Sequence, residues 1–205
     1  MSTLLMTMSW WFYRFQKVKL VRLPQAHLQK LDLSAPESLT SEVFREKLEA
    51  AGISLYEPDN VYKVPASHSL KNSQENITCR PLTQADEEIF TAFCADISEQ
   101  DLDDAWVELD HWVVYGLFID GKLAVASSLY PFRDSKLADL GVVTTPALRG
   151  KGLAKILVSY AHEQMQERDY FLQYRSQLDN LKSIGLAESM GLELVGQFEG
   201  EKTED

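Results

Sequence analysis

Hydrophobic and polar positions in the second half of the chain alternate in the spacings of both strands and helices. After Gly152, apolar residues recur at helical spacing, which predicts an amphipathic helix with one buried face. Asp120-Gly121 separates two runs of strand-forming residues and predicts a tight hairpin. The predicted elements are a helix at 84–96 capped by Thr83, an acidic helix at 101–109, strands at 112–119, 122–130 and 136–143, a helix from 153, a strand at 171–174, a helix at 180–190 and a strand at 193–198. The residues expected to face inward are Ile89, Phe90, Phe93 and Cys94 in the first helix, and Leu153, Ile156, Leu157, Tyr160, Ala161 and Met165 in the helix after the glycines.

The first 75 residues carry a different pattern, which predicts a small region of its own. A strand is expected at 17–23, and a helix at 41–50 that Thr40 caps and Gly52 ends. The inner face of that helix is expected to carry Phe44, Leu48 and Ala51. Two paired strands are expected at 53–56 and 61–64, around the turn at 57–60, and a polar linker at 65–75. A dense aromatic run predicts a strand or an intermolecular contact, because such side chains avoid water; it comprises Trp10, Trp11, Phe12, Tyr13 and Phe15.

Length and composition permit one large domain, or a core with a small addition. The chain has 205 residues, of which 45% are hydrophobic, and this is enough for a packed interior. Its formal net charge of -11 opposes binding to nucleic acid or anionic membranes, because those surfaces attract an excess of Lys and Arg. Arg14 interrupts the apolar N-terminal run, which lacks the features of a secretory signal or a membrane span. We therefore expect a cytoplasmic protein with no nucleic-acid or membrane partner.

Few side chains are arranged for disulfide or metal chemistry. Cys79 and Cys94 lie in different predicted elements, which favours two buried thiols over a disulfide. The four histidines are His27, His68, His111 and His162. Their wide spacing does not match a metal-binding motif, so no metal is predicted. His162 follows the core-facing Ala161 and is expected to be exposed or to cap a neighbour.

The segment from Val142 to Ala154 passes from a β-branched run through two glycines into a helix. Gly150 and Gly152 allow the backbone to turn tightly against a ligand, and the free amides that open a helix attract an anion. Arg149 and Lys151 add positive charge. The spacing matches neither a Walker loop nor a dinucleotide-binding fingerprint. The segment therefore predicts either a phosphate site or a purely structural connection.

Arg149-Gly150-Lys151-Gly152-Leu153-Ala154 resembles the Arg/Gln-x-x-Gly-x-Gly/Ala signature of the GNAT superfamily of acyl-CoA-dependent N-acetyltransferases. The segment from Asp179 through Ser183 to Gly191 is similar to that family's Asn-x-x-Ser/Ala motif and the helix after it, and Ile77–Thr83 resembles its opening strand. The resemblance covers about residues 76–198. It implies an α/β (α+β) fold, with a mixed, mostly antiparallel sheet flanked by helices. The small N-terminal α/β extension at 1–75 would precede an acetyltransferase domain at 76–205.

The resemblance further implies that acetyl-CoA is the cosubstrate. In the family fold, the strands that end near Val143 and Tyr174 separate, the acyl-bearing arm enters the gap, and the pyrophosphate lies on amides that follow Arg149. Asn180 would bind the arm or hold the loop beside it, and it is also suited to cap a helix without any ligand. The residues expected to bind the cosubstrate are Val142, Val143, Thr144, Arg149, Gly150, Lys151, Gly152, Leu153, Ala154, Asn180 and Ser183.

The chemistry implied by the resemblance is direct attack of a neutral amine on a thioester carbonyl. This reaction needs a base for the ammonium group, a donor for the oxyanion and a proton for the leaving thiolate. The residues expected to be catalytic are Asp139 as base, the amide of Val142 or its neighbour as oxyanion donor, and Ser183 close to the thiolate. Other candidate bases are Glu108, Asp110 and His111, and Asp139 is also suited to be a structural hydrogen-bond acceptor.

One position departs from the family pattern. Many relatives have a tyrosine seven residues after the position of Asn180, and this chain has Ala187 there. Tyr160, Tyr174 and Ser183 are the candidate replacements. Two functions therefore stay open: an N-acetyltransferase that transfers acetyl from acetyl-CoA to a primary amine, or a non-catalytic acyl-CoA-binding sensor or interaction module. The acidic surface favours a cationic small-molecule or peptide acceptor, and the first 75 residues are expected to shape its site or form a homodimer contact.

Overall fold

The computed structural model describes residues 6–7, 11–15, 18–23, 25–31, 33, 40–65 and 76–202. The chain divides into two compact units, and each is described by itself. The first unit contains residues 1–62, 176–184 and 194–205, and the second contains residues 63–175 and 185–193. Residues 66–75 of the predicted linker lie outside the described residues, as do Trp10 and His68. The predicted domain boundary after residue 75 stays a prediction.

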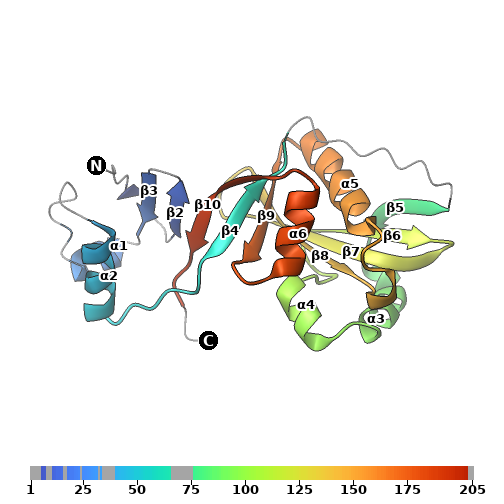
Figure 1. Cartoon of the computed structure of the whole chain (residues 1–205), viewed down its shortest axis with the longest axis horizontal. Coiled ribbons are helices and arrows are strands. Elements are labelled where there is room, and N and C mark those ends of the chain that lie inside the picture. Colours follow the sequence, from blue (N-terminus) through green and yellow to red (C-terminus); the bar gives the residue numbers. More distant parts are fainter. Residues whose placement is uncertain are drawn as a thin grey trace. The chain divides into compact units, whose positions relative to one another are not determined.

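A mixed sheet forms the centre of the second unit (Figure 1). Its strands are β5 (Ile77–Leu82), β6 (Val113–Ile119), β7 (Lys122–Pro131), β8 (Leu137–Thr144) and β9 (Phe171–Gln177), in the order β9-β8-β7-β6-β5. The pairs from β5 to β8 are antiparallel, and β8 and β9 are parallel. Asp120 and Gly121 have φ angles of 49° and 80°, which suit a two-residue hairpin turn. The predicted hairpin and the mostly antiparallel sheet are confirmed.

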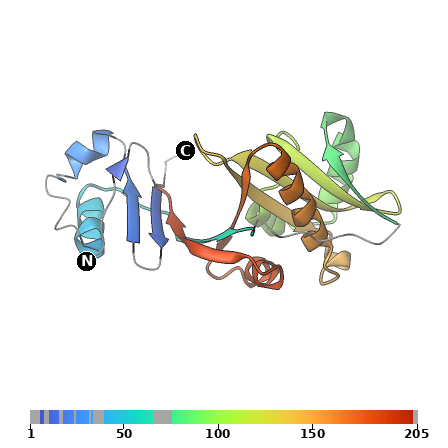
Figure 2. The same ribbon diagram turned by 90° about the horizontal axis from the view of Figure 1, so that it is seen from above.

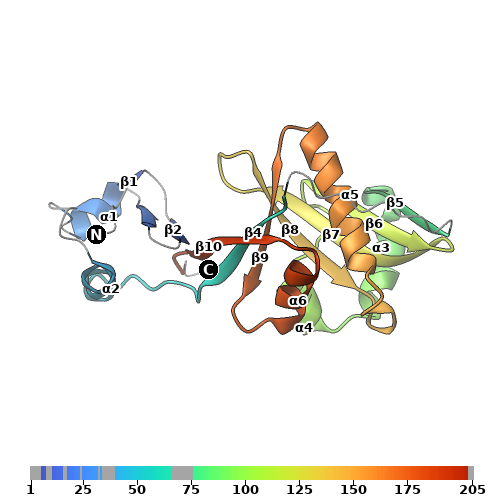
Figure 3. The same cartoon turned by 45° about the horizontal axis from the view of Figure 1, so that its top comes forward.

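Helices cover both faces of this sheet (Figures 2 and 3). They are the short 3-10 helix η2 (Gln84–Asp86), α3 (Glu87–Ala95), α4 (Glu99–Ala105) and α5 (Leu153–Glu167). Helix α5 lies across β6, β7 and β8 on one face, and α3 lies on the other. Phe93, Ile97 and Val107 from the α3–α4 layer pack against Ala126 of β7 and Val143 of β8. This packing places the side chains of Ala126 and Val143 on the face that α3 and α4 cover.

Helix α5 buries a wider arc than its apolar spacing predicts. Its buried residues are Leu153, Leu157, Val158, Ser159, Ala161, His162 and Met165. His162 is 3% exposed, which corrects the expectation that it is exposed. The reason is that α5 contacts three strands, so the side chains beside the central apolar stripe also meet the sheet.

The predicted inner face of α3 is only partly correct. Phe93 is buried, whereas Ile89 is 41% exposed and points away from the core. Cys79 and Cys94 are free thiols and partly buried, as predicted from their separate elements. Burial raises the pKa of Cys79 to about 11, so this thiol is protonated and a weak nucleophile at neutral pH.

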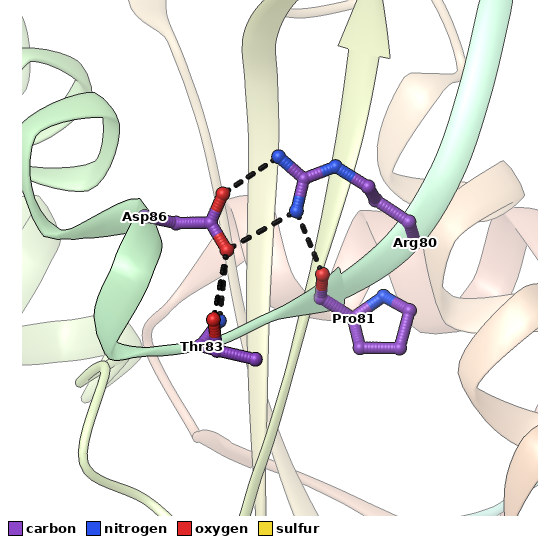
Figure 4. Close-up of polar contacts among 4 residues, drawn as sticks. All are labelled: Arg80, Pro81, Thr83 and Asp86. Atoms are coloured by element: carbon purple, nitrogen blue, oxygen red, sulfur yellow. Dashed lines mark hydrogen bonds and ion pairs between the residues drawn. The ribbon is translucent and has the colours of Figure 1, made fainter.

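A carboxylate fixes the turn that leads from β5 into η2 (Figure 4). The Arg80 guanidinium donates to both Asp86 oxygens, at 2.7 and 3.1 Å, and to the Pro81 carbonyl at 2.9 Å. The Thr83 backbone N–H donates to Asp86 Oδ2 at 2.9 Å. Hydrogen bonding from Arg80, followed by the Thr83 amide, lowers the pKa of Asp86 to about 2. Thr83 is therefore the helix start that the sequence predicts, although a 3-10 turn precedes α3.

We expect Asp86→Asn to lower the free energy of unfolding by about 1 kcal/mol at neutral pH, because it weakens this helix start and frees Arg80. The folded pKa of about 2 lies below the unfolded value of about 3.9. The contribution of this carboxylate is therefore complete above about pH 4 and is lost as the pH falls toward about 2. Urea unfolding of the parent and of Asp86→Asn across that pH range measures the difference in the free energy of unfolding.

A constant difference between the two proteins at every pH contradicts the prediction. Glu88→Gln, an exposed carboxylate of α3, is the control and should change little.

The first unit joins short N-terminal strands to the last strand of the chain. Its elements are β1 (Met6–Thr7), β2 (Trp11–Phe15), β3 (Val18–Arg22), α1 (Gln25–Lys30), α2 (Ser41–Ala50), β4 (Asp59–Lys63) and β10 (Glu193–Glu199), and α6 (Leu181–Ser189) has residues in both units. Strand β2 pairs antiparallel with β3 and with β10, while β1 and β3 are parallel. The strands predicted for the aromatic run and for 17–23 are confirmed as β2 and β3. The side chains of the aromatic run lie outside the described part of the structure.

Helix α2 forms as its sequence predicts. Thr40 Oγ1 accepts a hydrogen bond from Val43 N at 3.3 Å, and Gly52 follows the helix with a φ of 66°. Phe44 and Leu48 are buried on its inner face. Their cluster is completed by Leu23, Leu31 and Ile53.

The strand pair predicted at 53–56 and 61–64 is wrong. Only residues 59–63 form a strand, and residues 54–56 meet the end of the chain instead. Tyr56 N donates to Gly200 O at 2.8 Å, and Lys202 N donates to Ser54 O at 2.9 Å. Local residue types show that a segment can extend, but its partner is decided by distant residues.

Candidate active site

Strands β8 and β9 separate toward their carboxyl ends. Their parallel ladder ends at the pair Leu140 and Tyr174, whereas β8 continues to Thr144. On its other edge, β8 stays paired with β7 as far as Thr144. The separation that the family resemblance implies is therefore present, and it leaves one edge of residues 141–144 beyond the ladder.

The direction of the β8 amides follows from the pairing with β7. Thr145 N donates to Ala124 O at 3.1 Å, on the β7 side. The register between β7 and β8 is regular, and successive amides of a strand point to opposite sides. Val143 therefore directs its amide toward β7, while Val142 and Thr144 direct theirs toward the gap. Of the two valines predicted as oxyanion donors, only Val142 presents its N–H to the gap.

The glycine turn after β8 presents helix amides that no side chain caps. The 3-10 helix η3 (Pro146–Leu148) leads into it, and Gly150 and Gly152 have φ angles of 74° and 76°. A Cβ built at either glycine meets nothing within 4 Å. Gly152 is the N-cap of the 15-residue α5 and has no side chain to accept its first N–H groups, and Leu153 anchors the turn in the core. This geometry offers an anion several donors and the positive end of a helix dipole.

Arg149 braces the glycine turn. Its Nε donates to Thr144 O at 3.1 Å, and one terminal nitrogen donates to Asp101 Oδ2 at 3.0 Å. These contacts join the turn to β8 and α4. Lys151 is exposed beside it, and Ala154 lies in the first turn of α5. Phosphate binding by the two basic side chains stays a prediction.

Asn180 caps helix α6. Its Oδ1 accepts a hydrogen bond from Ser183 N at 3.0 Å, and its carbonyl accepts from Ile184 N at 3.0 Å. This is the structural role that the sequence left open. Asn180 and Ser183 belong to the first unit, and the glycine turn belongs to the second. Their predicted contacts with a cosubstrate stay predictions.

Asp139 is held by the neighbouring strand. It is 1% exposed, its Oδ1 accepts from Gln173 Nε2 at 3.0 Å, and its Oδ2 accepts from Arg175 at 2.7 and 2.8 Å. Three N–H donors therefore occupy most of the acceptor positions of this carboxylate. Arg175 also donates to Tyr130 Oη at 3.4 Å. Burial, and then the charge of Asp139, raise the pKa of Tyr130 above its ordinary value, so its hydroxyl stays neutral.

Sequence reasoning missed Gln173, Arg175 and Tyr130. Gln173 and Arg175 are two positions apart in β9, so both point to the same face of the sheet, and Asp139 pairs with Gln173 in register. Tyr130 is opposite Asp139 in β7. The polar alternation in Gln173-Tyr174-Arg175 was the available signal, but the partner of β9 cannot be read from it.

A second polar group, formed by His111, Ser128 and Trp106, lies two residues further along β8 toward the gap. His111 Nδ1 is 2.7 Å from Ser128 Oγ, and Ser128 Oγ donates to Trp106 O at 3.3 Å. The His111 ring meets the edges of Trp106 and Tyr130 at centroid distances of 5.0 and 5.5 Å. Ser128 pairs with Gly141 of β8, so the group borders the residue just before Val142. Of the three alternative bases from the sequence, His111 is the one inside this group, while Glu108 and Asp110 are exposed.

The end of α4 lies directly on Gly141. A Cβ built there would come within 2.0 Å of Ala105 O and 3.2 Å of Trp106 O. Trp106 ends the helix in the left-handed region, with φ 45° and ψ 55°, and its N–H donates to Leu102 O at 2.8 Å. For a bulky residue this conformation costs about 1–2 kcal/mol. Because Gly141 has no side chain, the strained end of α4 can pack directly on the sheet beside the gap.

Ala187, which replaces the tyrosine of many relatives, is fully buried. Its carbonyl accepts hydrogen bonds from Met190 N and Leu192 N at 3.2 and 3.0 Å. Among the candidate replacements, Tyr160 packs edge-on against Tyr115 at 5.3 Å, and Tyr174 is buried in β9. Tyr160, Tyr174 and Ser183 stay the predicted replacements for the tyrosine that Ala187 lacks.

Among residues 6–65 and 76–202, apart from the short gaps named above, no three His, Cys, Asp or Glu side chains form a group that could hold a metal ion. In the same part of the chain, none of the helices combines the length and the apolar character that crossing a membrane requires.

Solved structures share this fold. An acetyltransferase of the GNAT family from Novosphingobium aromaticivorans matches with a TM-score of 0.53 and 22% identity over 74% of this chain and 67% of its own. One from Colwellia psychrerythraea matches with a TM-score of 0.53 and 17% identity over 73% and 57% of the two chains. The GNAT domain of S. lividans PAT matches with a TM-score of 0.52 and 15% identity over 68% of this chain and all of that domain. This chain thus spans about two thirds or less of the first two proteins.

These structures define the fold as that of GNAT acetyltransferases. Residues 80–192 match the family model described as "Acetyltransferase (GNAT) family". The match covers more than half of the 205 residues, and the chain therefore belongs to the GNAT acetyltransferase family. A comparison with curated proteins found no match.

Proposed function

We propose that this chain transfers the acetyl group of acetyl-CoA to a primary amine by direct attack in a ternary complex. The observation that carries the proposal is the break in the β8–β9 ladder beside the uncapped start of α5. The two features follow each other in the chain, so one ligand can use strand amides at one end and helix amides at the other. A ligand that joins an amide-containing thioester arm to a pyrophosphate could pair with the strand amides through its arm and with the helix amides through its phosphates.

The residues of the second unit fit acetyl-CoA. Val142 and Thr144 direct their amides into the gap, where the amide groups of a pantetheine arm would take the place of a strand neighbour. The open space at Gly150 and Gly152 admits a pyrophosphate close to the backbone, and the amide of Leu153 follows at the helix start. Acetyl-CoA, when bound, supplies an acetyl thioester that an amine nitrogen can attack.

Two further roles would fall to a backbone amide of β8 and to the buried ion pair of Asp139 with Arg175. We assign the oxyanion donor to the amide of Val142, because the Val143 amide is directed toward β7. We propose that Asp139 acts by positioning Arg175, since three N–H donors already contact its oxygens. A cationic acceptor suits the acidic chain, and a cytoplasmic location suits its composition.

We expect saturating acetyl-CoA to stabilise the parent protein, and Gly152→Glu to remove that effect. A ligand at one hundred times its Kd adds about 2.7 kcal/mol, a melting shift of roughly 5–10 °C for a protein of this size. The Glu side chain would occupy the anion's place and strain a φ of 76°. Thermal unfolding with and without acetyl-CoA measures the shift.

The control is Gly52→Glu, which has a comparable φ of 66° and equal open space in the first unit. It should lose stability yet keep the shift. A folded parent that shows no shift would sink the acetyl-CoA assignment.

The alternative is a non-catalytic acyl-CoA-binding module, and the observation in its favour is the buried Ala187. Without a tyrosine there, water or another hydroxyl must protonate the thiolate. Release of free thiol that depends on an added amine separates the two functions. Binding of acetyl-CoA without such release, across a panel of primary amines, supports the module.

A further inference from the structure

We propose that His111 is the general base for the acceptor amine, and that Trp106, Tyr130 and Glu108 form the site that receives a primary alkylammonium group. This inference rests on the proposed function and names the acceptor side of the same site. All four residues belong to the second unit, on the face of the sheet that α3 and α4 cover. None of them belongs to the glycine turn, which would hold the cosubstrate.

The group lies beside the predicted oxyanion donor. Ser128 pairs with Gly141, the neighbour of Val142, and the carbonyl of Trp106 lies over Gly141. Because directly opposed residues share a face, Ser128 and Gly141 both point toward the end of α4. A nucleophile held by this group therefore approaches the gap at the level of Val142. The missing side chain at Gly141 lets the end of α4 carry Trp106 this close to the strand.

The hydrogen-bond network assigns the tautomer of His111. With the Ser128 hydroxyl proton directed to Trp106 O at 3.3 Å, Ser128 Oγ accepts a hydrogen bond from His111 Nδ1 at 2.7 Å. In the neutral ring, Nδ1 therefore carries the proton and Nε2 carries the lone pair. A general base needs this arrangement, with one nitrogen anchored and the other ready to accept a proton.

The surroundings of Nε2 suit a cation. Glu108 Oε2 lies 3.6 Å away and can stabilise an imidazolium or attract an ammonium group. Trp106 is 50% exposed and lies 4.6 Å from Tyr130 between ring centroids, so the two rings give an aromatic wall that is open to solvent. The His111 side chain is itself only 12% exposed. A carboxylate and aromatic rings beside a shielded base suit the ammonium group of an alkylamine.

Three other charged residues, Asp110, Asp139 and Arg175, belong to the chain around this group. Asp110 is the exposed neighbour of His111 in the chain. Arg175 donates to the Tyr130 hydroxyl at 3.4 Å, and its ion pair with Asp139 compensates the charges of both residues. Glu108 is therefore the charged group that faces Nε2 directly.

One ammonium proton passes to His111 Nε2, and the freed nitrogen pair forms the C–N bond to the acetyl carbon. The C–S bond breaks with its electron pair going to sulfur, and the second nitrogen proton neutralises the thiolate, directly or through water. The imidazolium then gives its proton to solvent. The net reaction consumes an alkylammonium ion and acetyl-CoA, and it yields an N-alkylacetamide, CoA thiol and one proton.

The first part of the test measures which nitrogen of the His111 ring carries the proton, in the absence of substrates. Long-range ¹H–¹⁵N correlation spectra of the ¹⁵N-histidine-labelled protein should show His111 protonated on Nδ1, with the signal identified by its loss in His111→Gln. Ser128→Ala should weaken that preference. A ring protonated on Nε2 in the neutral parent overturns the proposal.

The second arm measures acetyl transfer to n-butylamine as the probe, by thiol release. His111→Gln should lower kcat by about 100-fold or more near neutral pH, with a smaller change in KM. The deficit should shrink as the pH approaches the amine's own pKa, because free amine is then abundant without a base; a merely structural role would not give this profile. His27→Gln, in the first unit, is the control and should match the parent.

The outcomes separate this inference from the proposed function. No acetyl-CoA shift in a folded parent overturns the proposed function. If the shift is present, equal rates for His111→Gln and the parent at every pH overturn the base assignment. A shift with no transfer to n-butylamine in the parent overturns the alkylammonium site.

Discussion

Gly141→Ala should destabilise the protein by about 3 kcal/mol or more and displace the end of α4 from the sheet. The added methyl group would come within 2.0 Å of Ala105 O, a backbone atom that cannot turn aside as a side chain does. Overpacking of a well-filled interior costs about 1–3 kcal/mol, and a backbone clash lies at the upper end of that range. Trp106 and its hydrogen bond to Ser128 would move with the helix end, so amine transfer should fall as well.

The matched control is Gly185→Ala, the same change at a helical glycine of the second unit. A Cβ there meets nothing within 4 Å, and alanine is favoured over glycine in helices by about 1 kcal/mol. The two variants should therefore change the urea midpoint in opposite directions. A Gly141→Ala protein as stable as the parent would show that α4 does not rest on the sheet as described.

Arg175→Met should cost about 3–5 kcal/mol, because it leaves the buried Asp139 carboxylate without its cation. The double variant Asp139→Asn with Arg175→Met should recover much of that loss, since neither charge is then buried alone. Urea unfolding of the parent, both single variants and the double variant gives the coupling energy.

The same four proteins decide the role of Asp139. A positioning role predicts that Asp139→Asn keeps measurable transfer wherever the fold is retained. Abolished transfer by a folded Asp139→Asn protein, with acetyl-CoA still bound, would restore Asp139 as the general base predicted from the sequence. Small costs in every single variant would show that the pair is not buried in solution.

Local signals predicted most of the elements, because each depends on residues close together in the chain. Asp120-Gly121 can adopt positive φ angles, and Thr40 and Thr83 carry hydroxyls that suit helix starts. The family signature at the glycine turn located the segment where a helix begins without a side-chain cap. The edges of these elements differ from the structure by only a few residues.

Partners across the sheet were beyond sequence reasoning. Residues 54–56 have the composition of a hairpin strand but pair with residues 200–202, more than one hundred positions away. The environment of Asp139 depends on the register of β8 against β9, which places Gln173 opposite it. His162 looked like a residue on the edge of an apolar stripe, and its burial comes from the three strands that α5 crosses. Register and helix placement result from packing of the whole unit rather than from local preference.

The early end of the β8–β9 ladder gives this sheet an internal edge. Proteins usually protect exposed strand edges, because any extended chain that carries amides can pair with them. Here the donors of Val142 and Thr144 lie along such an edge, in the middle of a sheet rather than at its border. An extended peptide and an amide-bearing cofactor arm carry the same backbone-like donors and acceptors, so pairing with that edge alone would not tell them apart. Under the proposed function, the glycine turn at the end of that edge would make the selection, because its free helix amides suit an anionic group and not another stretch of backbone.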